Sequence, residues 1–179
     1  MTEPRFRPGA GGRGRLEEEI RQRTTVAEPA ERALLNLLRS AAVLGQEHAR
    51  FLRPHGLTPA QYNALRILRG AHPETLPCGE VGARLVAPVP DVTRLLDRLA
   101  ARGLARRERD PLDRRVVRVG ITAGGLARLA ALDAPLAAWI RTRLAGLSDG
   151  RLEVLSELLE QARAPAAGDD RANPTGRSG

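Results

Sequence analysis

The residues of this chain best suited to chemistry are the arginines and aspartates gathered between Pro90 and Thr122. A helical pattern, PDVTRLLDRLAARG, runs there into an alternating segment, and the turn-rich stretch DPLDRR leads on to a second alternating segment, VVRVGIT. Guanidinium groups bind phosphate oxygens and the acceptor atoms of guanine, which duplex DNA presents together. A basic helix joined to a short basic hairpin therefore predicts a winged helix-turn-helix, with the helix in the major groove and the hairpin beside it.

The helix expected from Pro90 to Arg102 has an apolar and a polar side. Its apolar side belongs to the core and carries Val92, Leu95, Leu96 and Leu99. The candidate DNA-contacting residues lie on the opposite side and at its flanks: Pro90, Asp91, Thr93, Arg94 and Arg98. Arg94 and Arg98 suit guanine edges or phosphates, and Thr93 suits a phosphate or a thymine methyl. Asp97 could accept from cytosine, but we favour an ion pair within the helix, with Arg94 or Arg98.

The expected hairpin concentrates positive charge, because six arginines stand close along it: Arg106, Arg107, Arg109, Arg114, Arg115 and Arg118. Asp110 and Asp113 offset only part of this charge. Asp113 lies two residues before Arg115, so it could brace the Arg115 guanidinium at a narrow tip suited to the minor groove. Arg114, Arg115 and Asp113 are therefore candidate DNA-contacting residues. The alternative is a charged edge that only prevents strands from associating.

The elements that must position these residues are mainly helical. Thr58, Pro59 and Gln61 form a capping box with proline at the first helical position, and Leu57 can pack on Tyr62. The wide apolar stripe of the first long helix favours burial against a second chain. The expected helices span residues 29–53, 58–69, 79–86, 90–102, 122–146 and 148–162, with a short one near 16–23, and the two expected strands span 104–109 and 116–121.

Composition narrows the class of function. The 179 residues carry a formal charge of +8, and all 29 basic residues are arginine, which fits a polyanionic partner as well as a GC-rich coding sequence. The single cysteine excludes an internal disulfide framework and fits a reducing cytoplasm. We expect no membrane span and no signal peptide. Neither metal-spaced Cys and His nor a phosphate-binding loop is apparent, so we predict no enzyme, no metal site and no cofactor.

The stretch DVTRLLDRLAARGLARRERDPLDRRVVRVGIT resembles the MarR family of transcriptional regulators. The family pattern RLxxxGLxxR is matched from Arg98 to Arg107, and DPxDRRxxxVxLT is matched from Asp110 to Thr122, with Ile121 in place of leucine. The segment LTPAQYNALRIL resembles the preceding family helix. Pro90 and Asp91 stand where the family commonly has Ser-Thr, which leaves the base preference there open.

The resemblance implies a mainly α fold, a winged helix-turn-helix with a short β-hairpin wing and a helical dimerisation region. It covers about residues 29–162. We expect a flexible basic arm over 1–28, a winged-helix domain over 29–163 and a disordered tail over 164–179. Within the domain, helices at about 29–53 and 123–163 would form the dimer, and a lobe at about 57–122 would bind DNA.

The resemblance also implies partners. A homodimer would bind a pseudo-palindromic operator in double-stranded DNA as a repressor, with Arg115 in the minor groove and Asp113 positioning it. Such regulators respond to small amphipathic, often phenolic effectors that bind between the dimer helices and the lobe. The candidate effector-binding residues in the matching region are Tyr62, His55, Arg66 and His48.

Two alternatives remain open. The chain could be a basic structural protein that coats nucleic acid without sequence choice. It could also be a redox-sensing regulator acting through Cys78, because that residue lies near a helix start, where the helix dipole favours a thiolate. In peroxide-sensing members of the family the reactive cysteine lies much earlier in the chain, near the first helix, so Cys78 does not match it.

Overall fold

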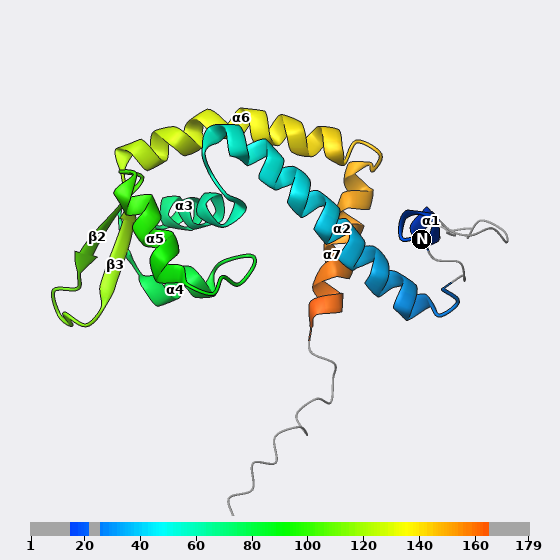
Figure 1. The fold of residues 1–179 in the computed structure, drawn as a ribbon, viewed down its shortest axis with the longest axis horizontal. Coiled ribbons are helices and arrows are strands. Elements are labelled where there is room, and N and C mark those ends of the chain that lie inside the picture. Colours follow the sequence, from blue (N-terminus) through cyan, green and yellow to red (C-terminus); the bar gives the residue numbers. More distant parts are fainter. Residues whose placement is uncertain (1–14, 22–25, 165–179) are drawn as a thin grey trace, which may run out of the picture. The chain divides into compact units, whose positions relative to one another are not determined.

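The computed structural model describes residues 15–21 and 26–164 (Figure 1). Most of the predicted basic arm, and the predicted tail from residue 165, lie outside the described residues. The chain divides into two compact units between Leu129 and Ala130, and each is considered by itself. In the described ranges, no helix combines the length and the apolar character that a bilayer span requires.

The described chain is mainly helical, as predicted. Its helices are, in chain order, α1 (Arg15–Glu19), α2 (Pro29–Leu52), the 3₁₀ turn η1 (Arg53–His55), α3 (Pro59–Ala71), α4 (Cys78–Ala83), α5 (Val92–Ala101), α6 (Ala123–Arg143) and α7 (Asp149–Arg163). The predicted boundaries of the long helices agree within a few residues, because proline, glycine and capping residues mark them. The sequence-predicted winged helix-turn-helix is confirmed, with α4 and α5 as its helix pair.

The wing contains one strand more than we predicted. Strands β2 (Ala105–Arg109) and β3 (Val117–Ile121) form the expected antiparallel hairpin, with Ala105 opposite Ile121. A two-residue strand, β1 (Leu76–Pro77), pairs with the other edge of β3, so the order is β1-β3-β2. No sequence pattern indicated β1, because its two residues stand in a proline-rich stretch that is typical of a loop.

Local capping chemistry fixes two helix starts. Thr58 Oγ1 accepts from the Gln61 N–H at 3.2 Å, and the Gln61 side chain accepts from the Thr58 N–H at 3.1 Å, which confirms the predicted capping box of α3. Thr122 Oγ1 accepts from the Gly125 N–H at 3.1 Å at the start of α6. Gly125 must be glycine for packing, since a Cβ there would come within 2.2 Å of the Leu104 carbonyl oxygen.

The core of the first unit lies between α3, α4, α5 and the sheet. Leu95, Leu96 and Leu99 of α5 are buried there, which confirms the predicted apolar side of this helix. Fully buried side chains from the other elements complete the core: Leu65 and Leu68 of α3, Val81 of α4, and Val119 and Ile121 of β3. Burial of this apolar area holds the wing strands and α5 in one rigid lobe.

Two arginines attach the end of α2 and η1 to this lobe. Arg102, the residue that ends α5, donates to the Gly56 carbonyl at 2.6 Å, and Arg128 of α6 donates to the His55 carbonyl at 2.7 Å. Both carbonyls lie at the C-terminal end of the α2–η1 segment, where backbone oxygens lack helical partners and favour cations. Gly56 turns the chain with a φ of 69°, a left-handed conformation that suits glycine.

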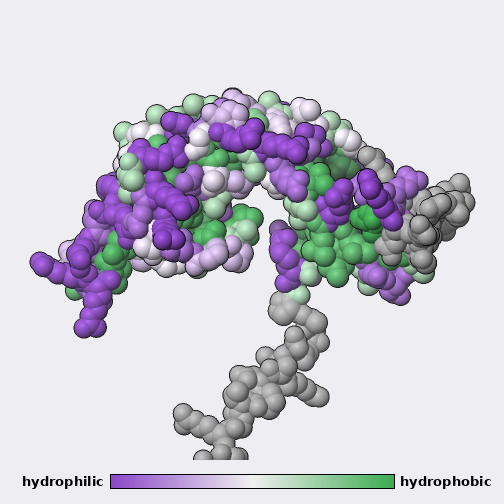
Figure 2. Space-filling view, in the orientation of Figure 1, coloured by the Kyte–Doolittle hydropathy of each residue, from purple (hydrophilic) through white to green (hydrophobic). Residues whose placement is uncertain are grey.

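Most of the rest of α2 is exposed within the first unit. Of its 24 residues only Leu52 is buried. The exposed leucines fall at helical spacings on one side of the helix: Leu34, Leu37, Leu38 and Leu44. Figure 2 shows a hydrophobic area over this helix.

Candidate nucleic-acid interface

Helix α5 begins at Val92, two residues later than predicted. Asp91 is its N-cap, with φ −142° and ψ 90°, and the Asp91 carboxylate accepts from the Arg94 N–H at 2.8 Å. We had expected Pro90 to be an early helical residue, and that expectation was wrong. An aspartate side chain satisfies a free N–H of the first turn, so the helix begins after Asp91 and Pro90 belongs to the preceding turn.

The polar side of α5 is exposed, as the sequence indicates. Thr93, Arg94 and Arg98 are exposed there, and the Arg94 Nε lies 3.9 Å from the Asp91 carboxylate. The Arg98 guanidinium has no partner among the described residues. Thr93 and Arg98 can therefore reach a partner molecule without breaking contacts inside the lobe, and Arg94 can do so by giving up its exposed ion pair with Asp91.

Asp97 is used differently from our expectation. Its carboxylate forms an ion pair with Arg107 of β2, not with Arg94 or Arg98. Arg107 is one of the six arginines of the basic hairpin, but it is half-buried and its Nη2 also lies 4.0 Å from the Cys78 sulfur. The pair joins α5 to the wing, and it removes one arginine from the charge available to DNA.

At the wing tip the arginine guanidinium groups are exposed, whereas the backbone is held by hydrogen bonds. Arg114 and Arg115 are exposed, and their guanidinium groups have no partner in the part of the chain that the structure describes. Asp113 accepts from the Arg115 backbone N–H at 2.9 Å, so it fixes the Arg115 backbone and not the guanidinium as we had expected. Arg109 donates to the Arg114 carbonyl at 3.1 Å across the tip. Figure 2 shows hydrophilic side chains gathered over this projecting wing.

A shallow groove of about 320 Å³ brings most of the candidate residues of α5 together. It runs between the start of α3 and the exposed side of α5, and its lining includes Pro90, Asp91, Arg94 and Arg98. Thr93 does not line this groove, and the wing residues lie on the separate projection. The candidate DNA-contacting residues therefore occupy two surfaces of one lobe, a grooved helix face and a hairpin tip, as a winged helix requires.

A second cavity, of about 440 Å³, holds three of the four candidate effector-binding residues. His48, Tyr62 and Arg66 line it, together with apolar side chains from α3 and the turn before α5. The His48 and Tyr62 rings meet edge to face at 5.8 Å, and the Arg66 guanidinium carbon lies 5.9 Å from the Tyr62 ring centre. Burial lowers the pKa of His48 below its ordinary value of 6.5.

His55 does not line this cavity. Its ring lies against Phe51 at 5.5 Å, and its carbonyl accepts from Arg128. Its place at the end of η1 makes it part of the attachment between α2 and the lobe. The 3₁₀ turn carries His55 past the end of α2, so it lies apart from the three candidate residues that line the cavity.

Sequence reasoning missed Asn63, which also lines the cavity. Its Oδ1 accepts from the Val86 N–H at 2.8 Å and so holds the turn between α4 and α5 against α3. The partner lies 23 residues away, so no local pattern could have indicated the contact.

Cys78 is the first residue of α4 and is half-buried. Its sulfur lies 4.0 Å from the Arg107 guanidinium, and the residue lines neither the cavity nor the groove. Over the described ranges, no three His, Cys, Asp or Glu residues gather as metal ligands would.

Comparison with known proteins agrees with this geometry. The sequence profile of the MarR family matches residues 55–116, which include the groove, strand β2 and the wing tip. The chain is 36% identical to a MarR transcription factor of Planctomyces limnophilus, covering 75% of this chain and 97% of that structure with a TM-score of 0.60.

Two further solved structures carry bound molecules. A MarR variant of E. coli in complex with operator DNA is 26% identical, with 74% and 96% coverage and a TM-score of 0.64. The PcaV transcriptional regulator of Streptomyces coelicolor, in complex with its natural ligand, is 25% identical, with 78% and 96% coverage and a TM-score of 0.64.

Proposed function

Since the chain belongs to the MarR family of DNA-binding transcriptional regulators, we propose that it is a dimeric, cytoplasmic repressor that a small molecule releases from its operator. The observation that carries this proposal is the division of arginines in the lobe. Arg102, Arg107 and Arg118 each contact another residue of the same chain, whereas Arg98, Arg114 and Arg115 are exposed and their guanidinium groups have no partner over the described ranges.

This division suits sequence-selective binding. In the proposed complex, α5 enters the major groove with Arg94 and Arg98 toward guanine edges or phosphates, flanked by Pro90, Asp91 and Thr93. The wing tip lies beside it, with Arg114 and Arg115 toward the adjacent minor groove and Asp113 fixing the Arg115 backbone. The ion pair between Arg107 and Asp97 joins the hairpin to the helix and helps to keep their separation constant, which a specific site needs.

The exposed leucines of α2 favour a dimer. Contact with water of a stripe of four leucines on a long helix costs free energy, and packing against a second copy of the same helix would remove that contact. Two copies related by a twofold axis would present two lobes to half-sites about 34 Å apart, so the operator should be pseudo-palindromic.

The cavity beside Tyr62 suits a small amphipathic effector. Its volume lies in the range of small-molecule sites, its walls are mostly apolar, and Arg66 supplies one cation. A planar aromatic anion would match both the apolar walls and the cation, with its ring against Tyr62 and its charge toward Arg66. The known complex of PcaV with its natural ligand supports a ligand-responsive role for this chain as well.

Selection of bound fragments from genomic DNA, followed by competition binding, tests the proposal. The wild-type protein should prefer its selected site over random duplex by ~10³-fold or more. Arg115→Ala should weaken operator binding by about 10- to 100-fold. Arg53→Ala removes the same charge from η1, outside the groove and the wing, and should cost less than about threefold.

A second arm of this experiment adds benzoate as a model aromatic anion to the complex. Benzoate should release wild-type protein from the operator, and Arg66→Met should need about tenfold more of it. Equal affinity for all duplexes, with equal losses for Arg115→Ala and Arg53→Ala, would instead favour a basic protein that coats nucleic acid without sequence choice. Operator binding that depends on oxidation of Cys78 would favour the redox alternative.

A further inference from the structure

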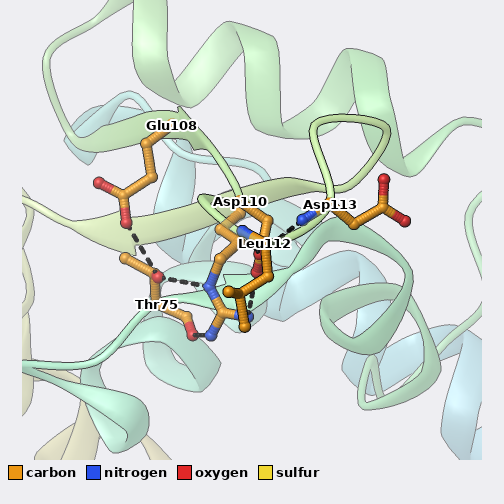
Figure 3. A network of polar contacts seen from close by, with 6 residues as sticks. Thr75, Glu108, Asp110, Leu112 and Asp113 are labelled. Carbon is orange, nitrogen blue, oxygen red and sulfur yellow. Dashed lines mark hydrogen bonds and ion pairs between the residues drawn. The ribbon is translucent and has the colours of Figure 1, made fainter.

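Arg118 of β3 differs from the other arginines of the wing, because its whole guanidinium group is bound inside the protein. Its Nε donates to Thr75 Oγ1 at 2.9 Å, its Nη1 donates to Asp110 Oδ2 at 3.2 Å, and its Nη2 donates to the Thr75 carbonyl oxygen (Figure 3). Every nitrogen of this side chain therefore has a protein acceptor. Arg118 is not available to a phosphate, although it lies in the same basic hairpin as Arg114 and Arg115.

Thr75 anchors this contact in the body of the lobe. Only 7% of the residue is exposed, and its hydroxyl accepts from Arg118 while it donates to Glu108 Oε1 at 3.0 Å. Its methyl group lies against Gly120 of β3, where a Cβ would come within 2.9 Å of Thr75 Cγ2. Thr75 stands directly before β1, so the network joins the segment between α3 and β1 to both strands of the hairpin.

Asp110 carries the network into the wing tip. Its Oδ1 accepts from the Leu112 N–H at 2.9 Å and from the Asp113 N–H at 3.2 Å, while its Oδ2 accepts from Arg118. The two backbone N–H groups and then the Arg118 guanidinium hold the pKa of Asp110 below its ordinary value of 3.8. The carboxylate thus stays charged, and it bridges the tip to the anchored arginine.

The chain of contacts ends at the proposed DNA-contacting residues. Asp113, whose N–H is bound by Asp110, accepts in turn from the Arg115 N–H at 2.9 Å. Without these contacts, a turn of this length between two strands would sample many backbone conformations. Ordering the turn when DNA binds would then reduce the free energy of binding. A tip that is ordered before DNA arrives avoids that cost.

We propose that Thr75 and Arg118 are positioning residues for DNA binding, which hold the wing tip in the conformation that presents Arg114 and Arg115. The proposal rests on the proposed function, because it assumes that the tip contacts DNA. It makes the affinity of the protein depend on a buried threonine that no nucleic acid can touch.

The test is operator affinity of Thr75→Val, with Thr75→Ser as its matched control. Valine keeps the shape and removes no charge, but it deletes the hydroxyl that joins Arg118 to Glu108. We expect affinity to fall about 5- to 10-fold in Thr75→Val and less than about twofold in Thr75→Ser. The slope of log affinity against log salt should stay that of the wild type, because no phosphate contact is removed.

A double-mutant cycle with Arg115→Ala separates positioning from general damage. If Thr75 acts through the tip, Thr75→Val should cost less than about twofold in the Arg115→Ala background. An undiminished loss in that background, or no loss in Thr75→Val alone, overturns the inference. If Arg115→Ala itself binds the operator like the wild type, the proposed role of the wing fails instead, so the two failures are distinguishable.

Hydrogen exchange of the free protein provides a readout that does not depend on DNA or on the stability of the valine variant. In Arg118→Gln the amides of Leu112, Asp113 and Arg115 should exchange at least about tenfold faster than in the wild type. Core amides of α5, such as that of Leu99, should keep their protection. Unchanged exchange at the tip would show that the network does not order it, and the inference would be wrong.

Discussion

Helices α5 and α2 have the same kind of sequence and very different surroundings. Both are amphipathic, with leucines repeated at three- and four-residue spacings. In α5 the leucines at 95, 96 and 99 are buried within the lobe, whereas α2 buries one residue of 24 and leaves Leu34 and Leu38 more than half exposed. The apolar side of a helix must be buried to be stable in water, and of these two helices only α5 buries it within the first unit.

The difference separates two roles. A helix whose apolar side is satisfied within its own lobe can expose its polar side to another molecule without losing stability. In the dimer that we propose, a helix whose apolar side is exposed within its own unit packs against a second chain. Variants that add charge to α2 should therefore affect assembly, whereas variants that remove volume from α5 should affect the stability of the lobe. Each variant tests this difference between the two helices.

The largest effect is expected for charge on the α2 stripe. Leu34→Glu combined with Leu38→Glu places two carboxylates at the centre of the proposed dimer interface, and burying them without partners is costly. The protein should become monomeric in sedimentation analysis, and operator affinity should fall more than about 100-fold because the two lobes no longer bind together.

Gln46→Glu is the matched control, because it adds a carboxylate to an exposed position of α2 outside the leucine stripe. It should leave both the assembly and the affinity unchanged. A doubly charged variant that remains dimeric would mean that α2 is not the dimer interface. The exposed leucines of α2 would then need another explanation.

A medium effect is expected for Leu99→Ala in α5. Leu99 is fully buried, so the substitution leaves a cavity and should lower the free energy of unfolding by about 2–5 kcal/mol. Leu112→Ala makes the same chemical change at a side chain that is 98% exposed on the wing, and it should change the free energy by less than about 0.5 kcal/mol. Urea unfolding of both variants measures the difference. Similar losses in the two would contradict the burial that distinguishes α5.

The parts of the structure that the sequence predicted are those set by near neighbours. The capping box at Thr58 depends on a residue three positions away, and the apolar side of α5 follows from helical periodicity. Contacts between distant segments could not be predicted in this way. Thr75 and Arg118 lie 43 residues apart, and Asp97 had two arginines nearby in its own helix yet pairs with one on β2.

The wing tip shows why even close spacing can mislead. Asp113 and Arg115 are two residues apart, and the prediction that they interact was right. The donor, however, is the Arg115 backbone N–H and not its guanidinium. A short aspartate side chain reaches the backbone N–H two residues on more readily than a long, flexible guanidinium folds back to it. The same preference for local backbone donors explains how Asp91 begins α5.

The smallest effect, a dependence of stability on pH, is expected where α2 enters the lobe. His48 lies near the C-terminal end of α2 against Tyr62, and burial lowers its pKa in the folded protein below 6.5. The unfolded chain then binds a proton more readily, so the contribution of His48 to stability is complete above about pH 6.5 and is lost as pH falls toward the lower folded pKa. His48→Gln should reduce this loss in urea unfolding between about pH 5 and 8, whereas His72→Gln, at an exposed position after α3, should not. If the two variants and the wild type follow the same curve, the C-terminal end of α2 is no more enclosed than its exposed N-terminal part, and the contrast within this helix fails.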